Sequence, residues 1–447
     1  MTTPGLTTVE LLMRGEEILA ATDPELAELL DAELRTQNDT LAAVAHASLA
    51  DPSVLVATGS VLGNVTAEGY PGARYHPGAE IFDSIERLAV RRACAVFGAR
   101  YANVQPHSCS AANQVVLYSL LDTGDTVLSL GLDDGGHLTH GARASMTGRH
   151  FQVVHYGLDD AGFIDYAAAA RLAATHRPKL VIAGASAYPR TIDYAAFRAI
   201  ADDVGAFLLA DISHVSGLVA AGLHPSPIDH AHVTTTSTYK QLGGPRGGLI
   251  LSGRDHATLA SRLDRGVFPR VQGTPNAAAI AGKARALHLA GTAEFRAWAR
   301  LIVADAQALA GALAARGHRI MTGGTDNHMV LVDVDAAGLT GVVAEKALRE
   351  CGILANRNRI SGDTKPATVG SGLRFGTNIL AQRGLTPAQV RRIGQLADRV
   401  LRSISTTGDT GYRLDPVVRA EVGAEVADIC RRFPFPGYTA ASKEEIS

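Results

Sequence analysis

The chain has 447 residues, of which 46% are hydrophobic, and its formal net charge is −2 at pH 7. This length predicts two or three domains with a sizeable core, and the small net charge gives no bulk attraction to nucleic acid or to an anionic membrane. The four cysteines form no CxxC pair, which is typical of free thiols in a reducing compartment. We find no signal-peptide pattern and no apolar run long enough to cross a bilayer, so we expect a cytoplasmic protein.

The first predicted elements are helical and polar. Apolar residues at helical spacing over residues 9–47 indicate an N-terminal arm, and an amphipathic helix is predicted at 85–98. Helical segments then alternate with short aliphatic and β-branched runs, which lie at 125–130, 151–156, 179–184, 206–211, 232–237 and 247–252. This alternation predicts an α/β fold with a mostly parallel sheet covered by helices.

A long alanine-rich helical stretch at 277–316 leads into a second, smaller α/β unit. We therefore expect an N-terminal helical arm over residues 1–58, a large domain over 59–295 and a small C-terminal domain over 296–447.

Polar residues follow three consecutive predicted strands. Ser186 follows the run at 179–184, Asp211 ends the run at 206–211 with His214 soon after it, and Lys240 follows 232–237. Ligands bind beyond the carboxyl ends of parallel strands, so these side chains are expected on one rim. Taken alone, Asp211 could equally cap the next helix.

Two further segments carry small or polar residues in turns. Ser108, Cys109 and Ser110 precede a helix, where free N–H groups favour a phosphate, although ordinary N-capping explains them as well. His137 and His140 stand in a glycine-rich turn. The turn suits a metal or a flat ligand, but no matching set of metal ligands is evident.

Together these features fit pyridoxal phosphate. This cofactor needs a lysine for its Schiff base, an acid at its pyridine nitrogen and a cradle for its phosphate. Arg374, in the segment GSGLRFGTN, suits a bidentate contact with a substrate carboxylate. The alternative for Arg374 is a structural ion pair.

At these residues the chain resembles the serine hydroxymethyltransferase family, from about residue 40 to 435. The matching motifs are AEGYPGARYHPGAE, FGARYANVQPHSCSAAN, GGHLTHG, ISHVSGLVAAG, TTTSTYKQLGGPRGGLIL, GGTDNH and GSGLRFGT. The resemblance implies a fold-type I transferase that depends on pyridoxal phosphate, with a mostly parallel seven-stranded sheet in its large domain. It also implies an obligate homodimer with shared active sites, which interconverts serine and glycine using tetrahydrofolate.

The resemblance also implies roles in cofactor binding. Lys240 would carry the Schiff base, Asp211 would pair with the pyridine nitrogen and His137 would stack on the ring. The remaining cofactor residues would be His214 and Ser186 near the phenolic oxygen, Ser108, Cys109 and Ser110 at the phosphate, Tyr239 beside the lysine, and Gly273 from the partner chain.

A second set of roles concerns the substrates. Arg374 would bind the amino-acid carboxylate, and Glu68 would be the acid or base at the substrate hydroxyl. Further substrate contacts are expected from Tyr75, His76, His46 and Ser237, and contacts with folate from Leu132, Leu138 and Asn358.

The departures from the family pattern lie mainly around the substrate. His46, Ala47, Ser48 and Leu49 replace its Ser-Glu-Asn-Tyr motif, Thr66 and His76 replace tyrosines, Tyr239 replaces a histidine, Cys109 replaces a glycine, and Arg270, Val271 and Thr274 alter its glycine-rich loop. The retained cofactor set with altered substrate positions favours a non-standard substrate, as in the family's threonine transaldolases and α-methylserine hydroxymethyltransferases.

We therefore expect an enzyme that makes or breaks the Cα–Cβ bond of a β-hydroxy-α-amino acid through a glycine quinonoid, with Glu68 assisting proton transfer. The alternative is an ordinary tetrahydrofolate-dependent serine hydroxymethyltransferase. Two further alternatives are decarboxylation or transamination with the same cofactor, and a catalytically silent relative, which the complete cofactor set disfavours.

Overall fold

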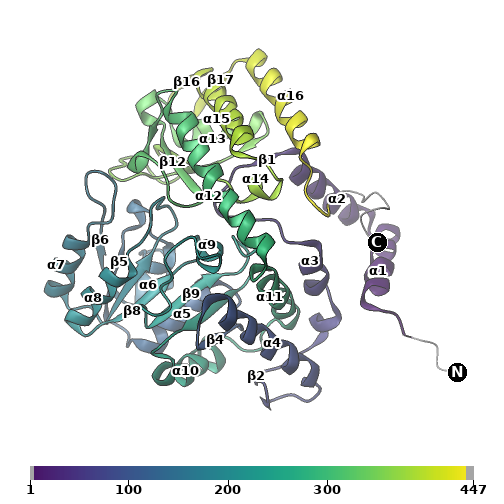
Figure 1. Ribbon diagram of the computed structural model, residues 1–447, viewed down its shortest axis with the longest axis vertical. Helices are drawn as coiled ribbons and strands as arrows, with labels where there is room; N and C mark the ends of the chain where they lie inside the picture. The colour runs from purple at the N-terminus through teal and green to yellow at the C-terminus, as the bar shows by residue number, and fades with distance from the viewer. Residues whose placement is uncertain (1–4, 439–447) are drawn as a thin grey trace.

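The computed structural model describes residues 5–438 and shows a large seven-stranded sheet and a smaller four-stranded sheet, each covered by helices (Figure 1). The large sheet has the order β4 (Tyr101–Asn103), β10 (Gly248–Ser252), β9 (Val233–Ser237), β8 (Phe207–Asp211), β7 (Leu180–Gly184), β5 (Thr126–Leu130) and β6 (Gln152–Tyr156). Strand β10 is antiparallel to β4 and to β9, and the other pairs are parallel. The predicted fold class is confirmed, as are the six predicted strands.

Both faces of this sheet are buried. In β7, Val181 and Ala183 belong to one apolar cluster, whereas Leu180 and Ile182 belong to another. Alternate residues of a strand point to opposite faces, so the continuous apolar runs of the sequence reflect helices on both sides. The covering helices are α4 (Glu80–Phe97), α5 (Cys109–Leu120), α6 (Met146–His150), α7 (Tyr166–His176), α8 (Tyr194–Val204), α9 (Ser216–Ala220), α10 (His256–Arg265) and α11 (Ala277–Ala290).

The smaller sheet is antiparallel and has its own core. Its order is β11 (Arg319–Ile320), β12 (Met329–Asp333), β15 (Gly372–Gly376) and β14 (Asn356–Asn358), and its helices are α12 (Ala293–Ala314), α13 (Gly341–Glu350), α14 (Asn378–Gln382), α15 (Pro387–Arg402) and α16 (Pro416–Arg432). Two short hairpins, β2 (Gly69–Tyr70) with β3 (Ala73–Arg74) and β16 (Ile404–Thr407) with β17 (Gly411–Leu414), complete the strands together with β1 and β13.

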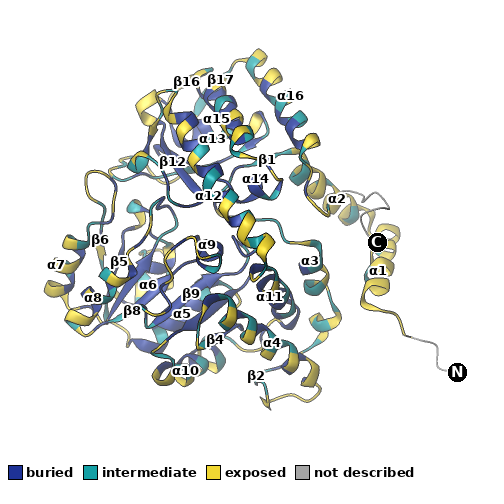
Figure 2. Ribbon diagram, viewed as in Figure 1, coloured by how far each residue is buried: buried dark blue, intermediate teal, exposed yellow. Residues whose placement is uncertain are grey.

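The N-terminal arm is helical only as far as Asp39. Helices α1 (Thr8–Thr22) and α2 (Pro24–Asp39) contain no buried residue and extend from the body, as Figure 2 shows. The chain then forms β1 (Leu41–Ala42), which pairs in parallel with β13 (Ile353–Leu354), and Leu41 and Ala43 enter the small-domain core. The prediction of helix to residue 47 is therefore wrong beyond residue 39, because strand pairing with a distant segment takes over. The short helix α3 (Pro52–Thr58) follows.

The alanine-rich stretch at 277–316 forms two helices rather than one. Gly291 ends α11, and the side chain of Thr292 accepts a hydrogen bond from the Phe295 N–H at 3.2 Å, which begins α12. A threonine at the N-cap satisfies a backbone donor that would otherwise lack a partner, so the break is built into the sequence.

Helix α12 is long and apolar enough to cross a bilayer by length and composition, which the sequence analysis did not expect. Half of its apolar window is buried inside the protein, and the helix packs against α15. The helix is therefore part of the core.

Asp305 is an unusual feature of α12. Its side chain is 0% exposed, and neither carboxylate oxygen has a hydrogen-bond partner within residues 5–438. Burial raises the pKa of this carboxyl to about 8. The pKa of an aspartate in the unfolded chain is about 3.9, so the folded state holds its proton more tightly and stability falls as pH rises from about 4 to 8.

We predict that Asp305→Asn stabilises the protein by about 1–3 kcal/mol near pH 8 and by little at pH 4, because it removes the cost of burying a charge. Thermal unfolding measured across this pH range checks this. Asp398→Asn is the matched control, because Asp398 is also buried but bonds to His318 and Arg402, and its replacement should destabilise. A gain for Asp305→Asn that does not depend on pH would contradict the prediction.

Candidate active site

Lys240 lies just beyond the carboxyl end of β9. Its side chain is 7% exposed and makes no hydrogen bond or ion pair with residues 5–438. Burial lowers the pKa of its amine to about 8, although the charge of Asp211 opposes this shift. A buried amine without a bonded partner is available as a nucleophile near neutral pH.

The hydroxyl-bearing residues before Lys240 bond to backbone carbonyls around the end of β9. The side chain of Thr236 donates to the Ser237 carbonyl at 3.0 Å, that of Ser237 to the Ser213 carbonyl at 3.3 Å, and that of Thr238 to the Pro245 carbonyl at 2.6 Å. These hydroxyls are therefore engaged with the backbone. Ser237, predicted to contact substrate, faces Ser213 instead of lining the cavity beside Lys240.

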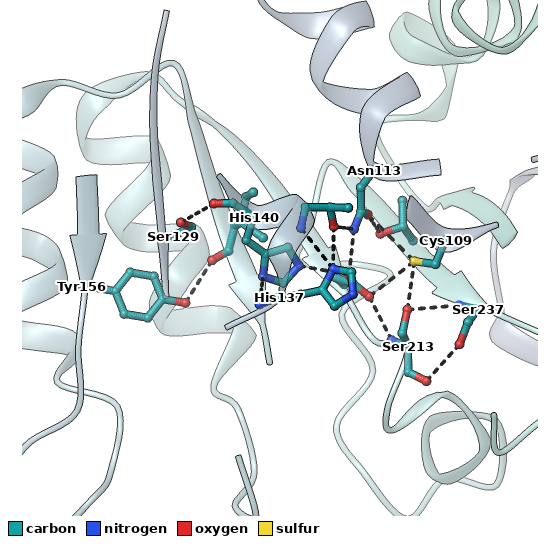
Figure 3. Close-up of polar contacts among 12 residues, drawn as sticks. Cys109, Asn113, Ser129, His137, His140, Tyr156, Ser213 and Ser237 are labelled. Carbon is teal, nitrogen blue, oxygen red and sulfur yellow. Dashed lines mark hydrogen bonds and ion pairs between the residues drawn. The ribbon is translucent and has the colours of Figure 1, made fainter. Parts of the chain in front are cut away.

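Asp211, at the end of β8, accepts hydrogen bonds from separate segments of the chain. Its Oδ2 accepts from Asn113 Nδ2 at 2.8 Å and from His140 Nε2 at 3.0 Å, and its Oδ1 accepts from the Ser213 N–H at 3.0 Å and faces Cys109 Sγ at 3.6 Å. Figure 3 shows these donors converging. Burial alone would raise the pKa of Asp211, but its hydrogen bonds, that from His140 foremost, outweigh it and hold the pKa well below its usual range.

His140 is itself oriented by the backbone. Its Nδ1 accepts the His137 N–H at 3.3 Å, so its Nε2 carries the hydrogen that faces Asp211. His137 accepts the Thr139 N–H at 3.2 Å through its own Nδ1, and burial lowers the pKa of His137 to about 4. Within residues 5–438 no group of three or more His, Cys, Asp or Glu side chains is arranged to hold a metal ion.

One cavity joins these groups. It is lined by Ser108, Cys109, Ser110, His137, His140, Ala185, Ser186, Asp211, Ser213, His214, Tyr239 and Lys240. The structure thus brings together all the predicted cofactor residues except Gly273. At its base, α5 begins at Cys109, and the Ser108 side chain caps the helix by accepting the Ala111 N–H at 3.0 Å. Nδ1 of His214, which is buried, has no hydrogen-bond partner within the described chain.

Arg374, on β15, brings the small domain to the same cavity. It donates to the Ser186 carbonyl at 2.5 Å and to Asn356 Oδ1 at 3.1 Å. No carboxylate among residues 5–438 lies within 4 Å of it, so the alternative of a structural ion pair is not met. Burial lowers the pKa of this guanidinium to about 10. A buried cation without an anion is suited to a ligand carboxylate.

His46 lies near the same cations. His46 is nevertheless exposed to solvent. The burial that it has, followed by the charges of Arg374, Lys240 and Arg246, lowers the pKa of His46 to about 4. Arg246 in turn stacks over Tyr239, with its guanidinium carbon 4.4 Å from the ring centre. Two of the departures from the family pattern therefore lie next to the cavity.

The remaining predicted substrate residues form a second, surface group. His76 Nε2 lies 3.7 Å from Glu68 Oε2, and the rings of Tyr75 and Phe268 are 5.5 Å apart. A Cβ added at Gly273 would lie 3.4 Å from Glu68 Oε1. None of these residues lines the cavity of Lys240, and the side chain of Tyr75 is 73% exposed. Glu68, Tyr75, His76 and Gly273 thus lie together but apart from the lysine of their own chain.

The residues predicted to contact folate come from two segments that an ion pair joins. Leu132 and Leu138 are 44% and 49% exposed in the loop that carries His137. Asn358 lies on β14, and the residue after it, Arg359, forms an ion pair with Asp133. The ion pair holds the two sides of this predicted folate site together.

Comparisons with known proteins agree on one family. The family model for serine hydroxymethyltransferase matches residues 19–397. A serine hydroxymethyltransferase of Paramagnetospirillum magneticum is 46% identical over 93% of this chain and 96% of its own length, and one of Synechococcus sp. is 47% identical over 94% and 97%. Another, from Alkalilimnicola ehrlichii, is 48% identical over 93% and 97%.

The chain belongs to the serine hydroxymethyltransferase family. It is therefore a transferase that depends on pyridoxal phosphate, as the resemblance predicted. The cavity fits that cofactor, because it is lined by a buried amine that bonds to no described residue, an ionised carboxylate and a capped helix N-terminus. The unpartnered Nδ1 of His214 offers one more polar contact.

Asn113 and His140 were not predicted to have a role in this serine hydroxymethyltransferase-family site. Asn113 lies one helical turn after Cys109, so its position on the inner face of α5 was a signal that could have been used. His140 was noticed only as part of a histidine pair. The sequence could not show that it points at Asp211, because that contact joins residues 71 positions apart.

We predict that the apoprotein reacts with pyridoxal phosphate at a rate that rises about tenfold per pH unit and levels off near pH 8, because only the neutral amine of Lys240 attacks the aldehyde. Stopped-flow absorbance of the apoprotein measures this rate. Nα-acetyl-lysine, whose pKa is near the ordinary value of about 10.4, is the control. A protein reaction whose rate keeps rising beyond pH 10 would contradict the lowered pKa.

Proposed function

We propose that this protein interconverts serine and glycine, with tetrahydrofolate as the carrier of the one-carbon unit. The observation that carries the proposal is that Lys240 and Asp211 line one buried cavity, while the guanidinium of Arg374, which has no carboxylate partner among residues 5–438, bonds to Ser186 at its edge. The curated relatives at 46–48% identity are serine hydroxymethyltransferases. These names support the ordinary activity better than the altered substrate that the sequence departures predict.

The bound cofactor would withdraw the electrons released when the Cα–Cβ bond of the amino acid breaks. Lys240 would hold the cofactor covalently, and Ser108, Cys109 and Ser110 would hold its phosphate. Asp211, kept ionised by its donors, would keep a proton at the pyridine nitrogen. Arg374 would bind and orient the substrate carboxylate, since it is buried beside Ser186 and has no carboxylate partner among residues 5–438.

Glu68 would exchange a proton with the substrate hydroxyl. It lies outside the cavity of its own chain, in the surface group with Tyr75 and Gly273. We therefore propose a cytoplasmic homodimer in which each cavity is completed by the surface group of a second copy. The exposed apolar side chains of the arm, such as Met13 at 60% and Leu29 at 62%, support burial against another chain.

One observation favours a second candidate function. His46 stands where the family has a serine, and it lies close to Arg374, Lys240 and Arg246. A larger ring at this point changes the shape of the pocket around Arg374, and Tyr239 is a second departure that lines the cavity. The candidate is the same bond chemistry on a different β-hydroxy-α-amino acid, such as threonine or α-methylserine, with an aldehyde in place of folate.

We predict that serine with tetrahydrofolate is turned over with a kcat/KM well above that of threonine or α-methylserine. Steady-state assays on the amino-acid panel, with and without tetrahydrofolate, check this. Glycine with tetrahydrofolate should also produce a new long-wavelength absorption band. Preferential turnover of threonine or α-methylserine without folate would instead establish the second candidate.

We predict that Glu68→Gln lowers kcat about 10²–10⁴-fold while the bound-cofactor absorbance is retained, because proton transfer is lost and the cofactor cavity is untouched. Glu80→Gln, at the exposed start of α4, is the matched control and should be neutral.

Mixing inactive Glu68→Gln and Lys240→Ala dimers tests whether the sites are shared. Hybrid dimers with shared sites contain one intact site, so random exchange of subunits should restore about a quarter of the activity. No recovery after proven subunit exchange would show that each site uses the Glu68 of its own chain.

A further inference from the structure

Lys283, on α11, is a buried cation that the cofactor site described above does not include. Its side chain is 2% exposed. Its Nζ donates to the carbonyls of Val104 at 2.6 Å, Pro106 at 2.9 Å and Gly248 at 3.1 Å. No carboxylate among residues 5–438 lies within 4 Å of it.

The three carbonyls belong to the backbone that supports the predicted phosphate cradle. Val104 and Pro106 lie between the end of β4 and Ser108, and Gly248 is the first residue of β10. The Pro106 carbonyl also accepts the Gly248 N–H at 2.9 Å. Lys283 therefore binds the segment that leads into α5 on one side and the neighbouring strand on the other.

The backbone at Gly247 and Gly248 packs closely against Lys283 and Ser108. A Cβ at Gly247 would lie 2.2 Å from Lys283 Cε, and one at Gly248 would lie 2.4 Å from the Ser108 carbonyl oxygen. Only glycines allow β10 to approach both groups so closely. The backbone of Ser108 thus rests against β10, which in turn contacts Lys283.

The hydrogen bonds match the charged form of this side chain. An ammonium has three N–H donors and Lys283 has three carbonyl acceptors, whereas a neutral amine would leave one carbonyl without a donor. Burial nevertheless lowers the pKa of Lys283 to about 7, and the charge of Glu86 opposes this only in part. Glu86 already bonds to Arg74 and Gln105. The cation is therefore held without an anion of its own.

The positive charge of Lys283 reaches the cradle. Partial burial, followed by the charge of Lys283, lowers the pKa of His107, the residue immediately before Ser108. The same positive charge would stabilise an anion bound at the N-terminus of α5. A phosphate dianion is the chemical group that this position suits.

We propose that Lys283 is a positioning residue for the cofactor phosphate: it fixes the turn over residues 104–108 through three carbonyls and supplies a buried positive charge behind the cradle. This inference rests on the proposed cofactor site. Lys283 acts through the backbone and the field rather than by touching the phosphate, so its loss should weaken ligands that carry a phosphate and spare those that lack one.

The test compares two variants with a matched control. Lys283→Met keeps the length of the side chain without charge or donors, and Lys283→Gln keeps two N–H donors without charge. Lys179→Met is the control, because Lys179 is exposed and precedes β7 at the opposite end of the strands. The dissociation constants of pyridoxal phosphate and of pyridoxal, which lacks the phosphate, are measured on the apoproteins by absorbance. The shift in melting temperature caused by inorganic phosphate is measured in parallel.

We expect both Lys283 variants to bind pyridoxal phosphate at least about tenfold more weakly, whereas their dissociation constant for pyridoxal should change less than about threefold. They should also lose the shift in melting temperature that inorganic phosphate causes. Lys179→Met should match the wild type. An equal loss of affinity for pyridoxal phosphate and for pyridoxal would show that Lys283 has only a structural role, which would overturn the proposal. Wild-type binding of pyridoxal phosphate and inorganic phosphate by Lys283→Gln would also overturn it. If Lys283→Met does not fold, Lys283→Gln decides the question. Failure of the wild type to bind pyridoxal phosphate would instead refute the proposed cofactor site.

Discussion

The site depends on the burial of one carboxylate, Asp211. An ionised carboxyl without partners inside a protein is destabilised by several kcal/mol, so its hydrogen-bond donors must all be in place. These donors come from α5, from the loop of His137 and His140, and from the turn after β8. Satisfying Asp211 therefore fixes the elements around the cavity relative to one another, and β9 delivers Lys240 to the same rim.

The buried cations differ from Asp211, because they lack partners of opposite charge among the described residues. Lys240, Arg374 and Lys283 are buried, and none has a carboxylate within 4 Å among residues 5–438. Burial lowers the pKa of each of them. Residues 5–438 thus supply no directly bonded anion for these three positive groups. A phosphate at α5 and a carboxylate at Arg374 would supply these charges, which is the electrostatic reason that the cavity suits an anionic cofactor with an amino-acid substrate.

The departures from the family pattern fall into two places for different reasons. His46 and Tyr239 lie beside the cationic pocket, where a change of side chain alters what the pocket accepts. His76 lies beside Glu68 in the surface group, away from the lysine of the same chain. Family membership therefore establishes the cofactor chemistry more firmly than it establishes which amino acid is the substrate.

The sequence by itself determined six of the seven strands of the large sheet, the family and the identity of most cavity residues. Strands of aliphatic and β-branched residues buried on both faces leave a continuous apolar run, and polar residues at their ends are visible in the same stretch. Tertiary structure decided what depends on contacts between distant segments. Examples are the pairing of β1 with β13, the His140 contact with Asp211, the separation of Glu68 from Lys240, and the carbonyl cage of Lys283. Local propensity cannot encode these features, because each exists only once the folded chain brings its two sides within bonding distance.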